Sequence, residues 1–325
     1  MLKALSALSG IAGQETELCS FIMQLFDHSQ YAVSVDTMGN LMIRKDVQSE
    51  NSGILVTAHL DEPGLIVTKI TDEGYLKFDI VGDLDSANII SKRVTVNGYP
   101  GVIGCKAIHL TTKEEREQQL KVNALFIDIG AKNKATAAAV VCPGDSVVFD
   151  SGYAALGNSY IKAKALRSRT GCAVLCRLLK ESTVPFTALF TSQKETGGRG
   201  AEVAVQKADF TKVIVLDCID SDQPSKQHKA QVCLGKGPAL SIVQTDTVLR
   251  WRLQNLAEDY KIPLQPETAA GYDPVLKKLS GVGNGIPGAL LRIPCRYMRS
   301  CSNVIDSQDL LHCYQLIKLL LEEEK

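Results

Sequence analysis

A stretch of short β-rich pieces, from about residue 64 to residue 150, interrupts a chain that otherwise alternates apolar strands with amphipathic helices. Turn sequences such as Asn97-Gly98 and Pro143-Gly144 separate these pieces. Short strands at this spacing are typical of a small β-barrel or sandwich. The expected strands span residues 65–70, 75–80, 93–96, 102–103, 124–127 and 146–149. The pattern therefore predicts a small β-barrel domain that is inserted into a larger domain.

The segments on either side of this interruption predict an α/β domain. Residues 53–58 form a continuous apolar run, which is typical of a strand covered on both faces. Further strands are expected at residues 31–35, 41–44, 187–190, 212–216 and 289–293, and helices at residues 18–26, 171–179, 200–207, 248–260 and 310–323. Such alternation favours a mostly parallel sheet with helices on both faces. We expect an α/β domain from residues 1–63 and 157–325, and a barrel domain from residues 64–156.

The composition argues against several classes of protein. Lys and Arg together number 36, as do Asp and Glu, so no overall charge favours nucleic acid or an acidic membrane surface. No apolar run approaches the ~20 residues that span a bilayer, and the N-terminal residues do not resemble a secretion signal. The ten cysteines are scattered without a Cys-x-x-Cys pair, as in a reduced protein. These features predict a cytoplasmic protein with no nucleic-acid or membrane partner.

Polar residues follow four of the predicted strands. In order along the chain they are His59, the pair Lys194-Glu195, Asp217 and Arg299. Ligands of open α/β sheets bind just beyond the carboxyl ends of the strands. A single polar residue at a strand end is more often an ordinary loop residue, but four strand ends with this character predict a common site.

The motifs at these positions resemble those of a known family. The sequence Ala58-His59-Leu60-Asp61-Glu62 is one of them, and the others lie at residues 164–171, 193–201, 271–273 and 294–300. Over nearly its whole length the chain resembles the dinuclear metallo-aminopeptidases of the glutamyl aminopeptidase and tetrahedral (TET) aminopeptidase family. This resemblance implies a two-metal catalytic domain with an inserted β-barrel. It also implies a homo-oligomer, either dimer-based or a tetrahedral dodecamer.

The resemblance assigns roles to several retained residues. His59 and Asp217 occupy the positions of ligands to one metal, and Glu195 occupies that of a ligand to the other. Asp61 occupies the position of the residue that braces the histidine, as metal-bound imidazoles generally require. Tyr272 and Asp273 match a segment near the substrate pocket, although Asp273 is also a good helix N-cap.

Three positions in the same motifs carry cations instead. Arg167 stands where an Asp bridges both metals, Lys194 where a Glu acts as general base, and Arg299 where a His binds the second metal. Arg is always protonated and only donates hydrogen bonds, so it cannot replace a ligand. A unit positive charge about 4 Å from a divalent ion costs roughly 8 kcal/mol at an effective dielectric constant of 20. We therefore expect no bound metal, or zinc or cobalt if the chain is active.

The same residues lead to three functional hypotheses. In the first, the three cations neutralise Glu195, Asp217 and Asp61, and the chain is a catalytically impaired subunit that assembles with itself or with an active paralogue. In the second, one metal binds between His59 and Asp217, and the chain hydrolyses the N-terminal residues of peptides. In the third, the cationic pocket binds an anion or a peptide.

Overall fold

The computed structural model describes residues 1–45, 53–113, 121–204, 210–221, 231–268 and 272–323. Its largest element is an eight-stranded sheet. In spatial order the strands are β1 (Tyr31–Val35), β2 (Leu41–Lys45), β12 (Thr187–Thr191), β3 (Ile54–His59), β13 (Lys212–Asp220), β16 (Gly288–Cys295), β14 (Ala239–Ser241) and β15 (Gln265–Glu267).

The centre of this sheet is parallel. Strands β12, β3, β13 and β16 run in the same direction, whereas β2 pairs antiparallel with β12 and β14 pairs antiparallel with β16. Every residue of β3 and β12 is buried. The predicted mostly parallel sheet is confirmed, with antiparallel strands towards its two edges.

Helices cover both faces of the sheet. Successive side chains of a strand point to opposite sides, and the apolar side chains on each side form a core with the helices that cover it. The helices are α1 (Leu2–Ala7), α2 (Thr16–Gln24), α5 (Leu166–Glu181), α6 (Arg199–Ala204), α7 (Thr247–Asp259), α8 (Pro274–Ser280) and α9 (Ser307–Glu323). Side chains of α1, α2, α5, α7 and α9 share one core with the strands, and those of α6 and α8 share another. None of the helices in the described ranges has the length and apolar character needed to cross a bilayer. The predicted helix 200–207 extends past Ala204 into residues outside the described ranges.

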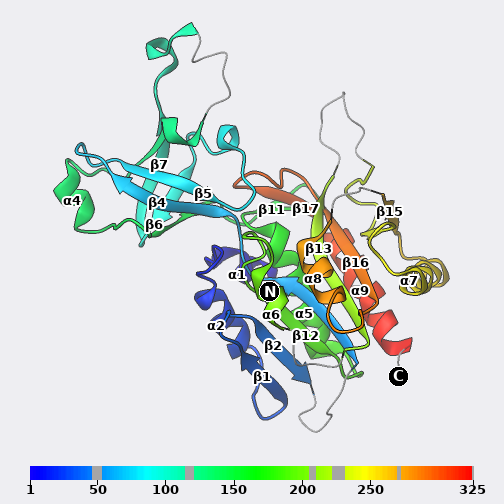
Figure 1. The fold of residues 1–325 in the computed structure, drawn as a ribbon. Helices are drawn as coiled ribbons and strands as arrows, with labels where there is room; N and C mark the ends of the chain where they lie inside the picture. Colours follow the sequence, from blue (N-terminus) through cyan, green and yellow to red (C-terminus); the bar gives the residue numbers. More distant parts are fainter. Residues whose placement is uncertain (46–52, 114–120, 205–209, 222–230, 269–271, 324–325) are drawn as a thin grey trace.

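The inserted segment folds into a closed six-stranded barrel with its own apolar core. Its strands are β4 (Gly64–Ile70), β5 (Leu76–Val81), β6 (Arg93–Val96), β7 (Tyr99–Cys105), β8 (Leu125–Asp128) and β9 (Ser146–Phe149). The remaining elements are helix α4 (Lys134–Ala138), the 3-10 turns η1 (Ser86–Asn88), η2 (Ile108–Leu110) and η3 (Val122–Ala124), and a small sheet of β10 (Ala154–Leu156), β11 (Tyr160–Ala163) and β17 (Asn303–Asp306). Figure 1 shows the barrel projecting from the α/β part. The predicted barrel is confirmed, and the exact domain boundaries stay a prediction.

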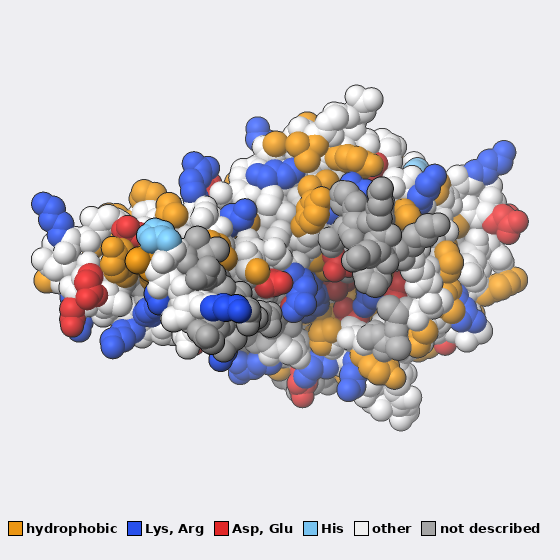
Figure 2. Space-filling model, turned by 90° about the horizontal axis from the view of Figure 1, so that it is seen from above, with side chains coloured by type: hydrophobic (Ala, Val, Ile, Leu, Met, Phe, Trp, Pro, Cys, Tyr) orange, Lys and Arg blue, Asp and Glu red, His pale blue; other side chains and the backbone are white. Residues whose placement is uncertain are grey.

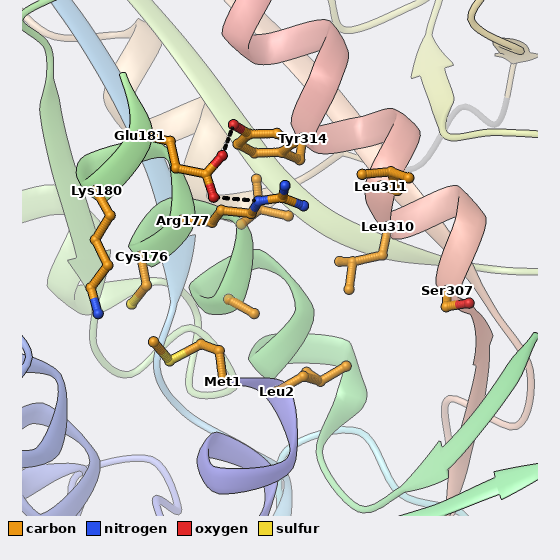
Figure 3. A pocket seen from close by; sticks show the side chains of 12 residues that line it. Met1, Leu2, Cys176, Arg177, Lys180, Glu181, Ser307, Leu310, Leu311 and Tyr314 are labelled. Carbon is orange, nitrogen blue, oxygen red and sulfur yellow. Dashed lines mark hydrogen bonds and ion pairs between the residues drawn. The ribbon is translucent and has the colours of Figure 1, made fainter. Parts of the chain in front are cut away.

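A polar network joins α5 to α9 beside a hollow of about 280 Å³ (Figure 3). Glu181 accepts hydrogen bonds from Tyr314 Oη and from Arg177 Nε, the latter at 2.9 Å. The Arg177 guanidinium also lies 4.0 Å from the centre of the Tyr314 ring. The floor of the hollow is largely apolar, and Lys180 and Ser307 are further polar residues that line it. The contacts among Arg177, Glu181 and Tyr314 therefore tie α5 to α9.

The first turn of α9 contains a buried carboxylate that gives a pH-dependent prediction. Asp309 accepts hydrogen bonds of 2.7 Å from the backbone N–H groups of Gly235 and Gly237. Gly237 has φ +86°, and a Cβ there would lie 1.9 Å from the Pro263 carbonyl oxygen, so only glycine fits. Burial raises the pKa of Asp309 to about 6, against a smaller opposing effect of these two bonds.

The folded state consequently binds the Asp309 proton more tightly than the unfolded state does. That contribution to stability is fully present below the unfolded pKa near 4 and is lost as pH rises through 6. We expect the free energy of unfolding of the wild type, relative to Asp309→Asn, to fall by up to about 3 kcal/mol between pH 4 and pH 7. Urea denaturation of both proteins across this range measures the difference. Two parallel stability curves would contradict the prediction.

Candidate functional site

Parallel pairing brings the predicted strand ends together. Strand β3 ends at His59, which lies in register with Thr191 at the end of β12. Asp217 lies in β13, which pairs with the other side of β3. Lys194 and Glu195 lie in the turn that follows β12. These side chains from three neighbouring strands therefore meet at one place, as the sequence predicted, although β13 continues past Asp217 to Asp220 and does not end at Leu216.

Four buried side chains at this place form what we call the inner cluster: His59, Asp61, Lys194 and Asp217. Lys194 Nζ donates a 2.6 Å hydrogen bond to Asp217 Oδ2. His59 Nε2 lies 3.5 Å from Asp217 Oδ1, and its Nδ1 lies 3.3 Å from Asp61 Oδ1. Asp61 Oδ2 accepts a 2.6 Å hydrogen bond from the backbone N–H of Glu195. The Lys194 ammonium is thus hydrogen-bonded to one oxygen of Asp217, a carboxylate to which the family resemblance assigns the role of a metal ligand.

A second group, the outer cluster, consists of Asp83, Arg167, Glu195 and Arg299. Arg167 Nη1 lies 3.4 Å from Glu195 Oε1 and 3.8 Å from Asp83 Oδ2. Arg299 Nε donates a 2.8 Å hydrogen bond to Asp83 Oδ1. The backbone N–H of Asp83 donates to Glu195 Oε2 at 3.1 Å. Two cations and two carboxylates therefore balance one another across the junction of the barrel and the α/β part.

Asp83 was not predicted from the sequence. It follows β5 of the barrel, where Gly82 has φ +89° and a Cβ would lie 2.8 Å from Glu195 Oε2. This close approach requires glycine and lets the barrel backbone reach Glu195. The Gly82-Asp83 pair is a turn signal in the sequence, but nothing in it identifies Glu195 as the neighbour.

The predicted partner of Asp61 was wrong. We expected the side chain of Arg167, Lys194 or Arg299 to neutralise Asp61, but among the described residues its carboxylate contacts His59 and the backbone N–H groups of Lys194 and Glu195. Arg299 also lies differently from a buried ligand, since 60% of its side chain is exposed. It reaches the site through Asp83.

The charges of the two clusters shift several pKa values. Burial would raise the pKa of Asp217, but Lys194, His59 and Arg167 outweigh it and hold that pKa well below its usual value. Burial and Lys194 would lower the pKa of His59, and hydrogen bonds to Asp217 and Asp61 outweigh them and raise it. Burial would likewise lower the pKa of Arg167, but Asp217, Glu195 and Asp83 raise it. These interactions stabilise the ionised forms of Asp217, His59 and Arg167, as expected for groups held in internal ion pairs.

The backbone beside each of the three cations is strained. Ala165, Gln193 and Tyr297 have φ values of +56°, +54° and +61°, in the left-handed region that non-glycine residues rarely adopt. They lie one or two residues before Arg167, Lys194 and Arg299 respectively. Such conformations cost about 1–3 kcal/mol each and cluster at functional sites. The backbone therefore has the strained conformation that is typical of a functional site, although the side chains at this site form ion pairs.

The residues present do not fit a two-metal centre. Among the described residues, no group of three or more His, Cys, Asp or Glu side chains is arranged to hold a metal ion. His59 and Asp217 lie close enough to share an ion, but Glu195 is turned towards Arg167. A catalytic zinc usually has three protein ligands. No step through a metal can be derived from this arrangement.

The two remaining predicted residues have different surroundings. Asp273 is the N-cap of α8 and accepts hydrogen bonds of 2.9 Å from the N–H groups of Val275 and Leu276, which confirms the capping prediction. Burial and the nearby Asp217 raise the pKa of Asp273, so it borders the inner cluster. The Tyr272 side chain is 75% exposed. Its assignment to a substrate pocket stays a prediction.

A mixed sheet covered by helices, an inserted barrel and a polar centre at the strand ends define a peptidase-like class of protein. Residues 39–316 match the M42 glutamyl aminopeptidase family, which is metal-dependent, and the chain belongs to this family. A protein of Acetivibrio thermocellus, provisionally named an aminopeptidase, is 32% identical over 99% of this chain and 97% of its own length. The lysyl aminopeptidase of Pyrococcus furiosus is 27% identical over 100% of this chain and 97% of its own.

Solved structures agree with this assignment. The aminopeptidase APDkam598 of the archaeon Desulfurococcus kamchatkensis has a TM-score of 0.92 and 26% identity, covering 99% of this chain and 93% of its own. PhTET1-12s, described as a dodecamer, has a TM-score of 0.84 and 27% identity, covering 98% of this chain and 97% of its own.

On the face shown in Figure 2, basic and acidic side chains are interspersed, as the equal counts of the two charges suggest.

Proposed function

We propose that this chain is a catalytically impaired member of the aminopeptidase family, in which ion pairs stand in place of two metal ions. The observation that carries the proposal is the 2.6 Å contact between Lys194 Nζ and Asp217 Oδ2 inside a buried cluster. A lysine ammonium has three donors and no lone pair, so it competes with a metal for the carboxylate and offers nothing in return. The Arg167–Glu195 pair has the same effect in the outer cluster.

The missing general base supports the same conclusion. Two-metal hydrolysis needs a carboxylate that takes a proton from a metal-activated water. The family resemblance assigns that role to position 194, where the side chain here is a buried cation paired with Asp217. A lysine acts as a base only when it is neutral, and a carboxylate in contact favours its charged form.

Metal content and peptidase activity test this proposal together. The full chain is incubated with zinc or cobalt, dialysed, and measured by inductively coupled plasma mass spectrometry. We expect much less than one metal ion per chain and no release of N-terminal residues from a panel of short peptides. An active relative such as the lysyl aminopeptidase, treated in parallel, controls for the loading procedure. One or two retained metal ions with peptide hydrolysis would instead support an active enzyme with a rebuilt site.

We further propose that the chain acts as a non-catalytic subunit and associates with itself. Support comes from related proteins, since the TET1 peptidase of Pyrococcus horikoshii is described as assembling into a tetrahedron or a large octahedral shell. Co-assembly with an active paralogue is the alternative arrangement. A cytoplasmic location is supported by the ten cysteines, all in the described part of the chain and all free thiols.

A further inference from the structure

Helix α7 presents an apolar face to solvent. Its buried side, with Leu249, Leu253 and Leu256, packs into the core. The opposite side of such a helix is normally polar, but here Val248 is 60% exposed and Trp251 is 64% exposed. Trp251 is the only tryptophan of the chain. Just before the helix, Val243 is 55% exposed. We call these three side chains the α7 face.

A hollow of about 310 Å³ lies between α7 and the end of the sheet. Its apolar wall includes Ile242, Ile262 and Leu264, and α7 contributes Gln254, Ala257 and Glu258. The hollow thus borders the C-terminal half of the helix, whereas the α7 face belongs to the N-terminal half. Figure 1 shows α7 and the edge strand β15 at the outer side of the sheet, away from the barrel. Nothing in the described fold of one chain fills this hollow.

The charged side chains of α7 also differ between the two halves of the helix. The N-terminal half carries Arg250 and Arg252, and the C-terminal half carries Glu258 and Asp259. Two copies of this helix are therefore complementary in charge when they lie antiparallel, because the basic half of each faces the acidic half of the other. A two-fold axis has this property, since each contact between residues i and j occurs twice.

We infer that the α7 helices of two copies pack antiparallel around a two-fold axis, with Trp251 of each copy inserted into the hollow beside α7 of the other. A rotation axis near Gln254 and Asn255 places position 251 of one helix opposite position 258 of its partner. Glu258 lines the hollow, so the apolar knob and the hollow meet at the same step. This inference rests on the proposed self-association and names the surface that produces it.

The test uses the full chain and its Trp251→Glu variant. Trp251 is largely exposed, so the variant is expected to fold, which circular dichroism checks. Sedimentation velocity over a range of concentrations should show a dimer-based assembly for the wild type. The dissociation constant of the variant should be at least about 100-fold larger, the loss of affinity expected when a central aromatic residue is removed. The fluorescence emission of wild-type Trp251 should shift to shorter wavelength as the protein associates.

Two controls separate the possible outcomes. Trp251→Phe keeps an aromatic knob and should keep the assembly. Val35→Glu changes a side chain that is 45% exposed on β1, at the opposite edge of the sheet, and should also keep it. If the wild type stays monomeric at every concentration, both the self-association and this surface are wrong. If the wild type and Trp251→Glu assemble equally well, self-association stands and this surface is wrong.

Discussion

Replacing Glu62 with Gln is expected to lower the free energy of unfolding by about 3–5 kcal/mol, the range for removing one partner of a buried ion pair. Glu62 is buried between two cations. Lys164 Nζ donates to both of its carboxylate oxygens, at 2.8 Å and 2.9 Å, and Arg169 Nη2 donates to Oε1 at 2.9 Å. The backbone N–H of Gly10 donates to the same Oε1 at 3.0 Å. The substitution removes the buried counter-charge that Lys164 and Arg169 share.

The same group of side chains attaches the N-terminal segment to the core. Lys164 Nζ donates to the carbonyl oxygen of Leu8 at 2.8 Å, and Arg169 Nε donates to that of Leu5 at 3.0 Å. Burial lowers the pKa of Lys164, and Glu62 opposes this effect. Without Glu62 the lysine can lose its proton or turn to solvent, and either change loosens α1. We therefore expect the amide protons of α1 to exchange faster in the variant.

Urea denaturation at a fixed protein concentration measures the loss of stability, because any association would otherwise contribute. Glu322→Gln is the matched control. It makes the same chemical change in the exposed Lys318–Glu322 pair, which is 3.9 Å long, and should cost less than about 0.5 kcal/mol. A similar small effect for both variants would show that Glu62 does not hold the two cations in the fold.

The role of Glu62 illustrates what a sequence can and cannot indicate. The residue stands in a motif that the sequence makes obvious, but its partner Lys164 is 102 positions away. Helix α1 was not predicted, because a helix of six residues is marginal by itself and this one is held by bonds from α5. Strands β14 and β15, with three residues each, are likewise too short for a periodic pattern. The long apolar strands were predicted because burial on both faces leaves a continuous apolar run.

The candidate site was partly predictable for a similar reason. Parallel strands meet at their carboxyl ends, so the proximity of His59, Lys194 and Asp217 follows from topology. The pairing of cations with carboxylates was also expected from their charges. The partner of Arg299 was not predicted, because Asp83 comes from the inserted barrel. Within the described part of the chain, Arg299 binds Asp83 and does not contact the inner cluster. Local sequence carries no information about a contact between residues 216 positions apart.

Reversing the three cations together should restore metal binding. In the triple variant Arg167→Asp, Lys194→Glu and Arg299→His, the ammonium that contacts Asp217 is removed and three possible ligands are added. The strained backbone at Ala165, Gln193 and Tyr297 keeps the geometry of a built site. Acidic side chains placed together without a metal repel one another, so a divalent cation should bind preferentially to the folded state. At a free zinc concentration of about 100 times the dissociation constant, binding would then raise the free energy of unfolding of the variant by about 2.7 kcal/mol.

Mass spectrometry of dialysed protein and the zinc-dependent change in Tm measure this recovery independently of catalysis. The matched control, Arg167→Asn, Lys194→Gln and Arg299→Asn, removes the same positive charges without adding carboxylate or imidazole ligands. It should bind zinc at least 100-fold more weakly, because an amide is a poor zinc ligand. If the reversed variant is folded but retains no metal and shows no change in Tm, the backbone itself no longer matches a two-metal centre. If it retains metal, three side chains separate this chain from a metal-binding aminopeptidase.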